Sequence, residues 1–172
     1  ITGNSVRVFI GDPIPSTGSR IGLELTDGQA VFVEQGGLRS GFISGHVRLV
    51  GVPGITLDAT MTLRINQTTG AMARTFTVNG QEKKVVFTAT EISTAADGGG
   101  TRIPFLQIAG VDTTLSVADA VEFRGNVTFT RDAGRFLVGS NNFEAFVGKG
   151  PARLDGGAIN PDAVGLLVSN IQ

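Results

Sequence analysis

The sequence lacks cysteine, tryptophan and tyrosine, and it has a single histidine, His46. Without cysteine the chain can form no disulfide, no catalytic thiolate and no cysteine-ligated metal site. One histidine is too few for a transition-metal centre built from imidazole ligands. The missing tryptophan and tyrosine also remove the side chains on which sugars and single-stranded nucleic acids commonly stack.

Charge is sparse and balanced. The chain has 14 Lys and Arg against 15 Asp and Glu, and 17% of its residues are charged. No positive excess exists that could displace counterions from a nucleic acid. No run of 18 apolar residues occurs either, which excludes a helical membrane span. We therefore expect neither a nucleic-acid partner nor membrane insertion.

Strand-forming residues are abundant. The chain of 172 residues is long enough for one sizeable domain, and it contains 18 Val and 18 Thr. It also has 25 Gly, and clusters of Gly, Pro, Asp and Asn interrupt the chain roughly every ten residues, a spacing typical of short strands and turns. No segment shows a helical period of apolar residues, so we expect little or no helix.

Residues 56–66 alternate strictly, with apolar side chains at the odd positions and polar ones at the even positions. This period indicates a strand with one solvated face. Weaker or shorter patterns predict strands over residues 5–10, 21–25, 30–33, 41–50, 72–78, 84–90, 102–108, 114–118, 121–131 and 135–138. The predicted fold is all-β, an antiparallel β-sandwich or an elongated stack of β-sheets, with about 10–12 short strands.

Turn residues refine this picture. Asn79-Gly80 predicts a type I′ hairpin, and the three strands between residues 56 and 91 are expected to form a β-meander. Gly125 occupies an apolar position within residues 121–131, which suggests a bulge or a close backbone approach.

The two ends of the chain resemble each other. Residues 1–12 (ITGNSVRVFIGD) and 138–149 (VGSNNFEAFVGK) share their apolar pattern at a constant offset of 137. Both segments lead into Gly- and Pro-containing loops, after which residues 27–33 align with 162–168 at an offset of 135. The identical pairs are Asn4 and Asn141, Phe9 and Phe146, and Gly11 and Gly148.

This similarity predicts that residues 1–137 form one β-repeat unit and that residues 138–172 begin a second, homologous one. Two alternatives stay open. The chain could be a single pseudo-symmetric domain, or its terminal strands could pack back on, or exchange with, a neighbouring unit. Charges are reversed at matched positions, Arg7 against Glu144 and Asp12 against Lys149, and this favours unlike over like pairing of such strands.

Several segments resemble the Gly-, Val- and Thr-rich tandem β-repeats of giant bacterial surface and secreted proteins of the adhesin-like and RTX types. They are residues 44–60 (SGHVRLVGVPGITLDAT), 22–28 (GLELTDG) and 125–129 (GNVTF). The resemblance implies a spacer or structural module in an extracellular array, and it carries over no catalytic residue. The calcium-binding glycine- and aspartate-rich nonapeptides of RTX proteins are absent, so the resemblance does not imply that activity.

Few residues are candidates for chemistry. Any Ser-His-Asp triad would need His46, and no Gly-x-Ser-x-Gly elbow is present. Paired carboxylates could hydrolyse glycosides, with Asp58, Glu122 and Asp132 as candidates, but no Trp or Tyr platform accompanies them. We therefore expect a protein that is not an enzyme, with no catalytic or cofactor-binding residue.

Calcium is the strongest ligand candidate, because it prefers oxygen ligands on loops. Aspartates also occur in turns without any metal, because their side chains cap the backbone locally. The candidate ligands, all in Gly- or Pro-rich segments, are Asp12, Asp27, Asp97, Asp112, Asp155 and Asp162.

Together these features predict a non-enzymatic extracellular structural module of the adhesin type. It would be a spacer or assembly unit whose partners are neighbouring copies of the same repeat. One alternative is a calcium- or glycan-binding β-domain. Another is a pilus-like filament subunit joined by strand exchange.

Overall fold

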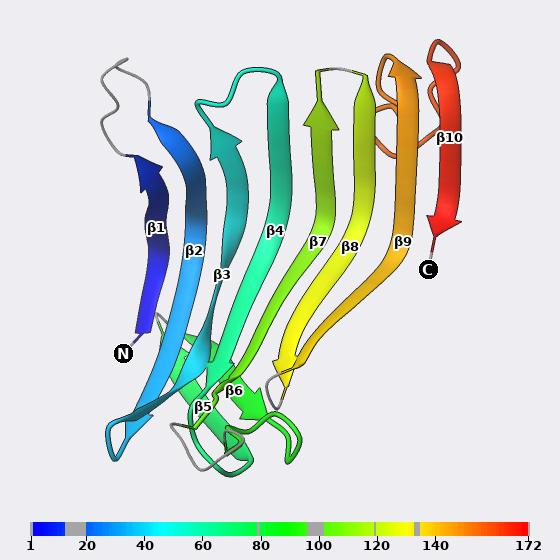
Figure 1. The fold of residues 1–172 in the computed structure, drawn as a ribbon. Coiled ribbons are helices and arrows are strands. Elements are labelled where there is room, and N and C mark those ends of the chain that lie inside the picture. The colour runs from blue at the N-terminus through cyan, green and yellow to red at the C-terminus, as the bar shows by residue number, and fades with distance from the viewer. Residues whose placement is uncertain are drawn as a thin grey trace.

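The computed structural model describes residues 2–12, 20–78, 80–95, 102–118, 120–132 and 135–171. These residues form ten β-strands and no helix (Figure 1). In chain order the strands are β1 (Thr2–Asp12), β2 (Ile21–Gln35), β3 (Leu38–Val50), β4 (Ile55–Asn66), β5 (Met72–Val78), β6 (Gln81–Phe87), β7 (Phe105–Val117), β8 (Val121–Asp132), β9 (Arg135–Lys149) and β10 (Val164–Ile171). The predicted all-β class is confirmed.

Eight of the strands form one antiparallel sheet in the order β1-β2-β3-β4-β7-β8-β9-β10. Apart from the step from β4 to β7, every strand pairs with its neighbour in sequence, so β1 and β10 lie at opposite edges (Figure 1). This simple order follows from the short connections, which favour antiparallel pairing of consecutive strands.

β5 and β6 form a separate two-stranded sheet, which packs against one end of the large sheet and adds a second sheet layer there (Figure 1). The predicted hairpin is therefore present, with Gly80 at a φ of 76°, whereas Asn79 lies outside the described residues. The expected meander over residues 56–91 is wrong, because β4 pairs with β3 and β7 and not with β5.

Several strands are longer than the sequence pattern predicted. Residues 21–25 and 30–33 belong to the single strand β2, and residues 102–118 contain the single strand β7. The Asp- and Gly-containing segments at 27–28 and 110–113 are register shifts inside these strands rather than turns. A β-bulge inserts an extra residue and breaks the alternation, so a bulged strand looks like two short strands in the sequence.

Bulges of this kind occur in every pair of neighbours in the large sheet except β3–β4. Gly125 lies at one of them, with a φ of 145°. The bulge that the sequence suggested at Gly125 is thus confirmed.

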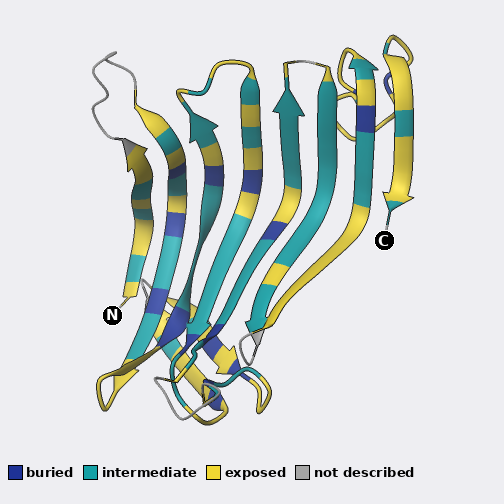
Figure 2. Ribbon diagram, viewed as in Figure 1, coloured by how far each residue is buried: buried dark blue, intermediate teal, exposed yellow. Residues whose placement is uncertain are grey.

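The main buried core lies between the hairpin and the end of the large sheet, where many of the buried residues gather (Figure 2). Phe87 and Phe105 pack edge to face there, with their ring centroids 6.2 Å apart. The hairpin therefore supplies the second layer that this part of the sheet needs to bury its side chains. The core consists of Val31, Met72, Val85, Phe87 and Phe105, with Val33, Phe42 and Phe76 packed against it.

A buried polar network holds the chain where it leaves β4 for the hairpin. Asn66 Oδ1 accepts hydrogen bonds from Ser40 Oγ at 2.6 Å and from the backbone N–H of Thr68 at 2.9 Å. Its Nδ2 donates to the backbone carbonyl of Glu91 at 2.7 Å. Because each buried group has a partner, the network fixes this exit at little desolvation cost.

Candidate functional site: edges and faces of the large sheet

The two faces of the large sheet differ in chemistry. We call the face that carries Leu25, Met61 and Phe123 the apolar face, and the one that carries Glu24 and Arg124 the polar face. The alternation along each strand produces this division, because successive side chains point to opposite sides of a sheet. No helix of the described ranges has the length and apolarity to cross a membrane.

The apolar face is hollowed by two shallow grooves that meet at Met61. One is lined by residues that include Val8, Leu25, Val47 and Ile108, and the other by residues that include Leu115, Phe123, Phe129 and Phe143. Near the sheet edges the apolar side chains are open to solvent, with Ile10 69% and Leu166 67% exposed. The apolar face therefore extends from β1 to β10 with little cover.

On the polar face, charged residues form a row that runs across the strands. Their Cα atoms are partners in successive strand pairs, and their charges alternate in sign except where a threonine intervenes. Unlike charges on neighbouring strands attract, so this row favours the observed register. We call it the charge row; it consists of Glu24, Arg48, Asp58, Thr114, Arg124 and Glu144.

Glu24 anchors the charge row near the β1 edge. Its carboxylate accepts hydrogen bonds from Arg48 Nη2 at 2.6 Å and Nε at 2.9 Å, and it lies 3.4 Å from Arg20 Nη2. The hydrogen bonds from Arg48 hold the pKa of Glu24 below its ordinary value, and the nearby charges of Arg20 and Arg7 lower it further.

Glu144 has the corresponding role near the β10 edge. Arg153, from the loop before β10, donates Nε to Glu144 Oε2 at 2.6 Å and also binds Glu144 Oε1. These bonds hold the pKa of Glu144 below its usual value, with a smaller contribution from the charge of Arg124, and they raise the pKa of Arg153. Arg124 itself also binds Glu122 at 2.8 Å.

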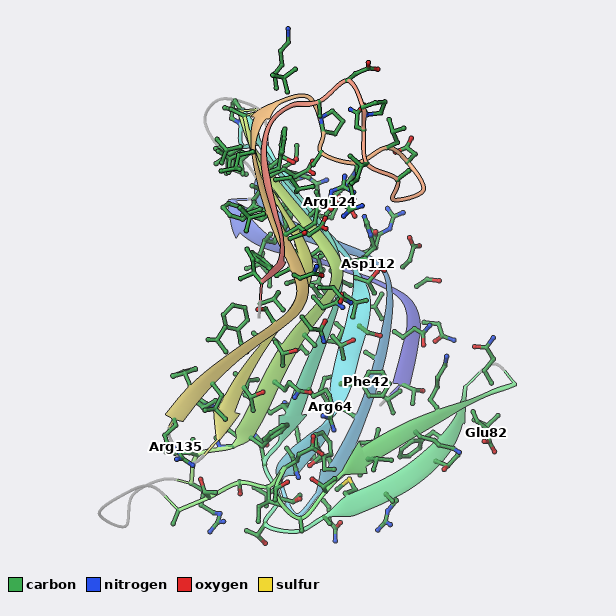
Figure 3. All side chains as sticks on the ribbon, turned by 90° about the vertical axis from the view of Figure 1, so that its right-hand side faces the viewer. Phe42, Arg64, Glu82, Asp112, Arg124 and Arg135 are labelled. Carbon is green, nitrogen blue, oxygen red and sulfur yellow. The ribbon has the colours of Figure 1, made fainter. Side chains whose placement is uncertain are left out.

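Arg64 joins the large sheet to the hairpin, and Figure 3 shows it beside Phe42 on the side of the sheet that carries the hairpin. Its Nη1 donates to Glu91 at 2.6 Å and to Gln107 at 2.9 Å, and its Nη2 donates to the carbonyl of Val86 at 2.8 Å. The guanidinium also lies over the Phe87 ring, 4.9 Å from the centroid. These bonds to Arg64 lower the pKa of Glu91.

The two edges of the sheet have the same local geometry. Five consecutive Cα pairs between β1 and β2 match five pairs between β9 and β10, with an offset of 137 in the first strand and 143 in the second. The range runs from Val8↔Leu25, which matches Ala145↔Val168, to Asp12↔Ile21, which matches Lys149↔Val164. The connecting segment is therefore six residues longer before β10 than before β2.

A bulge follows at the same place in both pairs. Val6 lies opposite Gly28 in the first pair, and Phe143 lies opposite Ile171 in the second. The residues at the bulges also share their backbone conformation: φ is 55° and 52° at Ser5 and Asn142, and 51° and 58° at Asp27 and Asn170. Asp and Asn tolerate this left-handed region better than most residues, which explains their use there.

Each pair also contains two glycines face to face, Gly11 with Gly22 and Gly148 with Gly165. A Cβ atom on Gly22 would lie 2.3 Å from the carbonyl oxygen of Ile10, and one on Gly165 would lie 2.3 Å from that of Val147. Neither position can hold a side chain unless the strands move apart. The two ends of the chain thus need glycine for the same steric reason.

The predicted alignment of residues 27–33 with 162–168 is wrong in this geometry. Asp27 lies inside β2, whereas Asp162 lies in the turn before β10. The residue equivalent to Asp27 is Asn170, at an offset of 143. The predicted offset of 135 did not allow for the six extra residues in the loop before β10. A comparison of two short sequence segments cannot detect such an insertion.

The calcium candidates do not converge among the residues that the structure describes. Asp27 and Asp112 lie at bulges of β2 and β7, on different parts of the sheet. Asp155 and Asp162 share the loop before β10. Asp12 is the last residue of β1, and the structure does not describe its side chain. Asp97 lies outside the described residues. Within the described part of the chain, no group of three or more acidic or histidine side chains is placed to hold a metal ion.

His46 lies on the polar face, and its Nε2 is 3.3 Å from Asp58 Oδ2. Both side chains are substantially exposed. Glu122 pairs with Arg124, which lies two residues along the same strand. The contact of Asp58 with His46 was not expected from sequence, because it depends on the register of β3 and β4. The charge row was missed for the same reason.

Comparison with protein-family models, with curated proteins and with solved structures finds no match for this chain. The functional argument therefore depends on the geometry of this chain alone. Its most informative features are the two similar strand pairs at the edges and the charge row between them.

Proposed function

We propose that this chain is a non-enzymatic structural module of an extracellular array, with residues 1–137 as one unit and residues 138–172 as the start of the next. The observation that carries the proposal is the common register of β1–β2 and β9–β10, with its matching bulge and glycine pair. Two unrelated hairpins would have no reason to share all three features.

The order of the strands supports a linear arrangement of units. β1 and β10 lie at opposite edges of the sheet, and consecutive strands are neighbours (Figure 1). A chain that continues beyond either edge would add strands in the same direction across the sheet. In such an arrangement each added unit makes the array longer, and length is what a spacer on a cell surface has to provide.

The chemistry of the polar face is consistent with a structural role. Its best-defined charged groups bind one another: Arg48 with Glu24, Arg64 with Glu91 and Arg153 with Glu144. Carboxylates paired in this way are stabilised as anions and are poor proton donors near neutral pH. They stabilise the sheet rather than form a reactive centre.

The test is made on the natural polypeptide that carries this sequence. An antibody raised against the chain should detect a protein much heavier than 17.8 kDa. Limited proteolysis should cut it into fragments that differ by one unit of 137 residues. Protease added to intact cells should remove the signal, because an extracellular array is accessible. A polypeptide no larger than this chain, or one protected inside intact cells, would contradict the proposal.

Light scattering on the purified chain distinguishes the two forms of assembly. A single monomer mass over a wide concentration range is expected if units are joined by covalent succession. An open-ended series of multiples would instead indicate a filament subunit joined by strand exchange.

A further inference from the structure

The outer edge of β1 is free in the described chain, since β1 pairs only with β2. A free edge strand presents a row of unpaired backbone N–H and C=O groups, which makes it a template for a further strand. The corresponding edge of β9, the strand that matches β1, is occupied by β8. The β8–β9 pair therefore indicates what kind of strand fits beside β1.

The register of that missing pair follows from the offset of 137. In β8–β9, Arg124 lies opposite Glu144, Asn126 opposite Asn141 and Thr128 opposite Gly139. Transferred to β1, the same positions of a β8-type strand would lie opposite Arg7, Asn4 and Thr2. All three of these residues are described, and Arg7, Asn4 and Thr2 are exposed to solvent.

Charge then specifies the strand further. The cross-strand partner of Glu24 in β1 is Phe9, but Arg7 lies at the adjoining bulge, near enough for its charge to lower the pKa of the Glu24 carboxyl. An exposed positive charge therefore lies beside the β1 end of the charge row. At the β8–β9 pair the same place is filled by opposite charges, Arg124 and Glu144.

We propose that the free edge of β1 binds the last strand of a preceding unit, a β8-type strand that carries a carboxylate opposite Arg7, so that one antiparallel sheet continues through successive units. This inference rests on the proposed function. It names the partner of the β1 edge and the register, and it predicts that an identical copy is a poor neighbour because Arg124 would face Arg7. The requirement for unlike neighbours would keep identical units from pairing at random.

A continuous sheet has a defined repeat distance. Each unit contributes six strands to the large sheet, namely β1, β2, β3, β4, β7 and β8. With strands spaced 4.7–4.9 Å apart, one unit would advance the array by about 29 Å. One β5–β6 hairpin would project from the sheet at each such interval.

The experiment uses a two-copy chain, in which a copy of residues 1–137 precedes the full chain. Because the natural sequence has no cysteine, two introduced thiols can react only with each other or with another molecule. The reporter pair is Thr128→Cys in the first copy and Thr2→Cys in the second, and both are combined with Arg124→Glu in the first copy so that a carboxylate faces Arg7. Directly opposite residues in an antiparallel pair have Cα atoms about 4.5–5.5 Å apart, within the range of a disulfide.

The matched control moves one thiol along the strand, with Thr130→Cys in place of Thr128→Cys. Its diagonal distance to residue 2 would be about 7–8 Å, beyond disulfide reach. We expect the reporter pair to oxidise to near completion within one chain, while the control remains reduced under the same conditions.

A double-mutant cycle tests the charge requirement. In the two-copy chain, Arg124→Glu in the first copy or Arg7→Glu in the second creates an unlike pair, whereas the parent and the double variant have like pairs. If the two residues face each other, the double variant will be less stable than the sum of the two single effects predicts, because it restores a like pair. This coupling, measured from denaturant midpoints, will shrink at high salt. The cycle cancels the separate cost that each substitution has for its other neighbours, Glu122 and Glu24.

Hydrogen exchange separates the possible failures. If β4 and β7 are protected in both copies but the reporter pair stays reduced and the cycle is additive, the continuous sheet is wrong and the units are separate beads. The tandem-unit proposal would survive that result. If the first copy shows no protection, residues 1–137 are not a folding unit, and the proposed function fails with them.

Discussion

At the scale of single residues, the chain is governed by steric fit at glycines and by a few charged partners. The facing glycines of β1–β2 and β9–β10 are needed because a Cβ atom at Gly22 or Gly165 would contact the opposite backbone. Glu24, Glu91 and Glu144 are each held by an arginine. Residue-scale changes should therefore have large effects at these positions and small effects nearby.

Replacing Gly165 by alanine should lower the free energy of unfolding by about 1–3 kcal/mol, because the added methyl forces β9 and β10 apart. Gly22→Ala should have a similar cost at the matching site. Gly139→Ala is the control, since its Cβ would meet no atom within 4 Å, and we expect a change within about 0.5 kcal/mol. Urea unfolding of the three variants measures the difference. Equal effects of Gly165→Ala and Gly139→Ala would rule out the steric explanation.

Glu91 should make stability depend on pH. The pKa of its carboxyl is lower in the folded protein than in the unfolded chain, so the stabilisation is present above the unfolded pKa and is lost as pH falls through the folded one. Glu91→Gln should thus cost about 1–2 kcal/mol near pH 7, and the deficit should shrink in acid. Urea unfolding at neutral and acidic pH checks this.

Glu82→Gln is the matched control, because Glu82 is exposed on β6 (Figure 3). We expect no more than about 0.5 kcal/mol of change at either pH. A deficit for Glu91→Gln that stays constant from neutral to acidic pH would show that the ion pair with Arg64 is not its cause.

At the scale of elements, the β5–β6 hairpin is the piece that builds a core. It supplies Met72, Val85 and Phe87, which close over Val31 of β2 and Phe105 of β7. Elsewhere the described residues place no second sheet against the large sheet, which is stabilised by backbone pairing, by contacts between neighbouring side chains and, near β9, by the loop that carries Arg153. The hairpin should therefore contribute more to stability than its length suggests.

Two adjacent valines of β6 test this contribution. Val85 is 1% exposed and faces the core, whereas Val86 is 51% exposed on the other side of the strand. Val85→Ala should lower the free energy of unfolding by about 1–3 kcal/mol, and Val86→Ala should change it by about 0.5 kcal/mol or less. Chemical denaturation of the two variants gives the comparison. If both valines matter equally, the hairpin does not pack as described.

At the scale of the whole molecule, the large sheet that the described residues form has two edge strands with no further partner strand, one polar face and one apolar face. In the proposed array, the free edges would determine how units join, and the charge row would determine which neighbours fit. The molecule is thus described better by its surfaces than by any cavity. The alternative function, a calcium-binding domain, also makes a prediction at this scale.

Millimolar calcium should leave the melting temperature unchanged if the chain acts as a structural module. A calcium concentration a hundredfold above the dissociation constant would stabilise the folded state by about 2.7 kcal/mol. Thermal unfolding with calcium, with magnesium at equal concentration, and with chelator tests this. A rise that is specific to calcium would favour the calcium-binding alternative and would direct attention to Asp155 and Asp162, which share one loop.

The alternation of residues 56–66 and the Asn-Gly turn were sufficient to predict β4 and the β5–β6 hairpin, because both signals are local. The bulge at Gly125 was predicted for the same reason. The predicted strand lengths were wrong where bulges interrupt the alternation of side chains. The predicted alignment of residues 27–33 with 162–168 was wrong because the loop before β10 is longer. A bulge depends on two strands at once, so one strand's sequence carries only half of its signal.

The sequence by itself determined the all-β class, the amphipathic strands and the similarity of residues 1–12 to residues 138–149. These follow from residue composition and from a period of two, which act along the chain. Only the tertiary structure decided that β5 and β6 leave the large sheet, that Glu24, Arg48, Asp58, Arg124 and Glu144 form one row, and that β1 keeps a free edge. The physical reason is that pairing register and strand order depend on contacts between residues far apart in the chain, which no local pattern encodes.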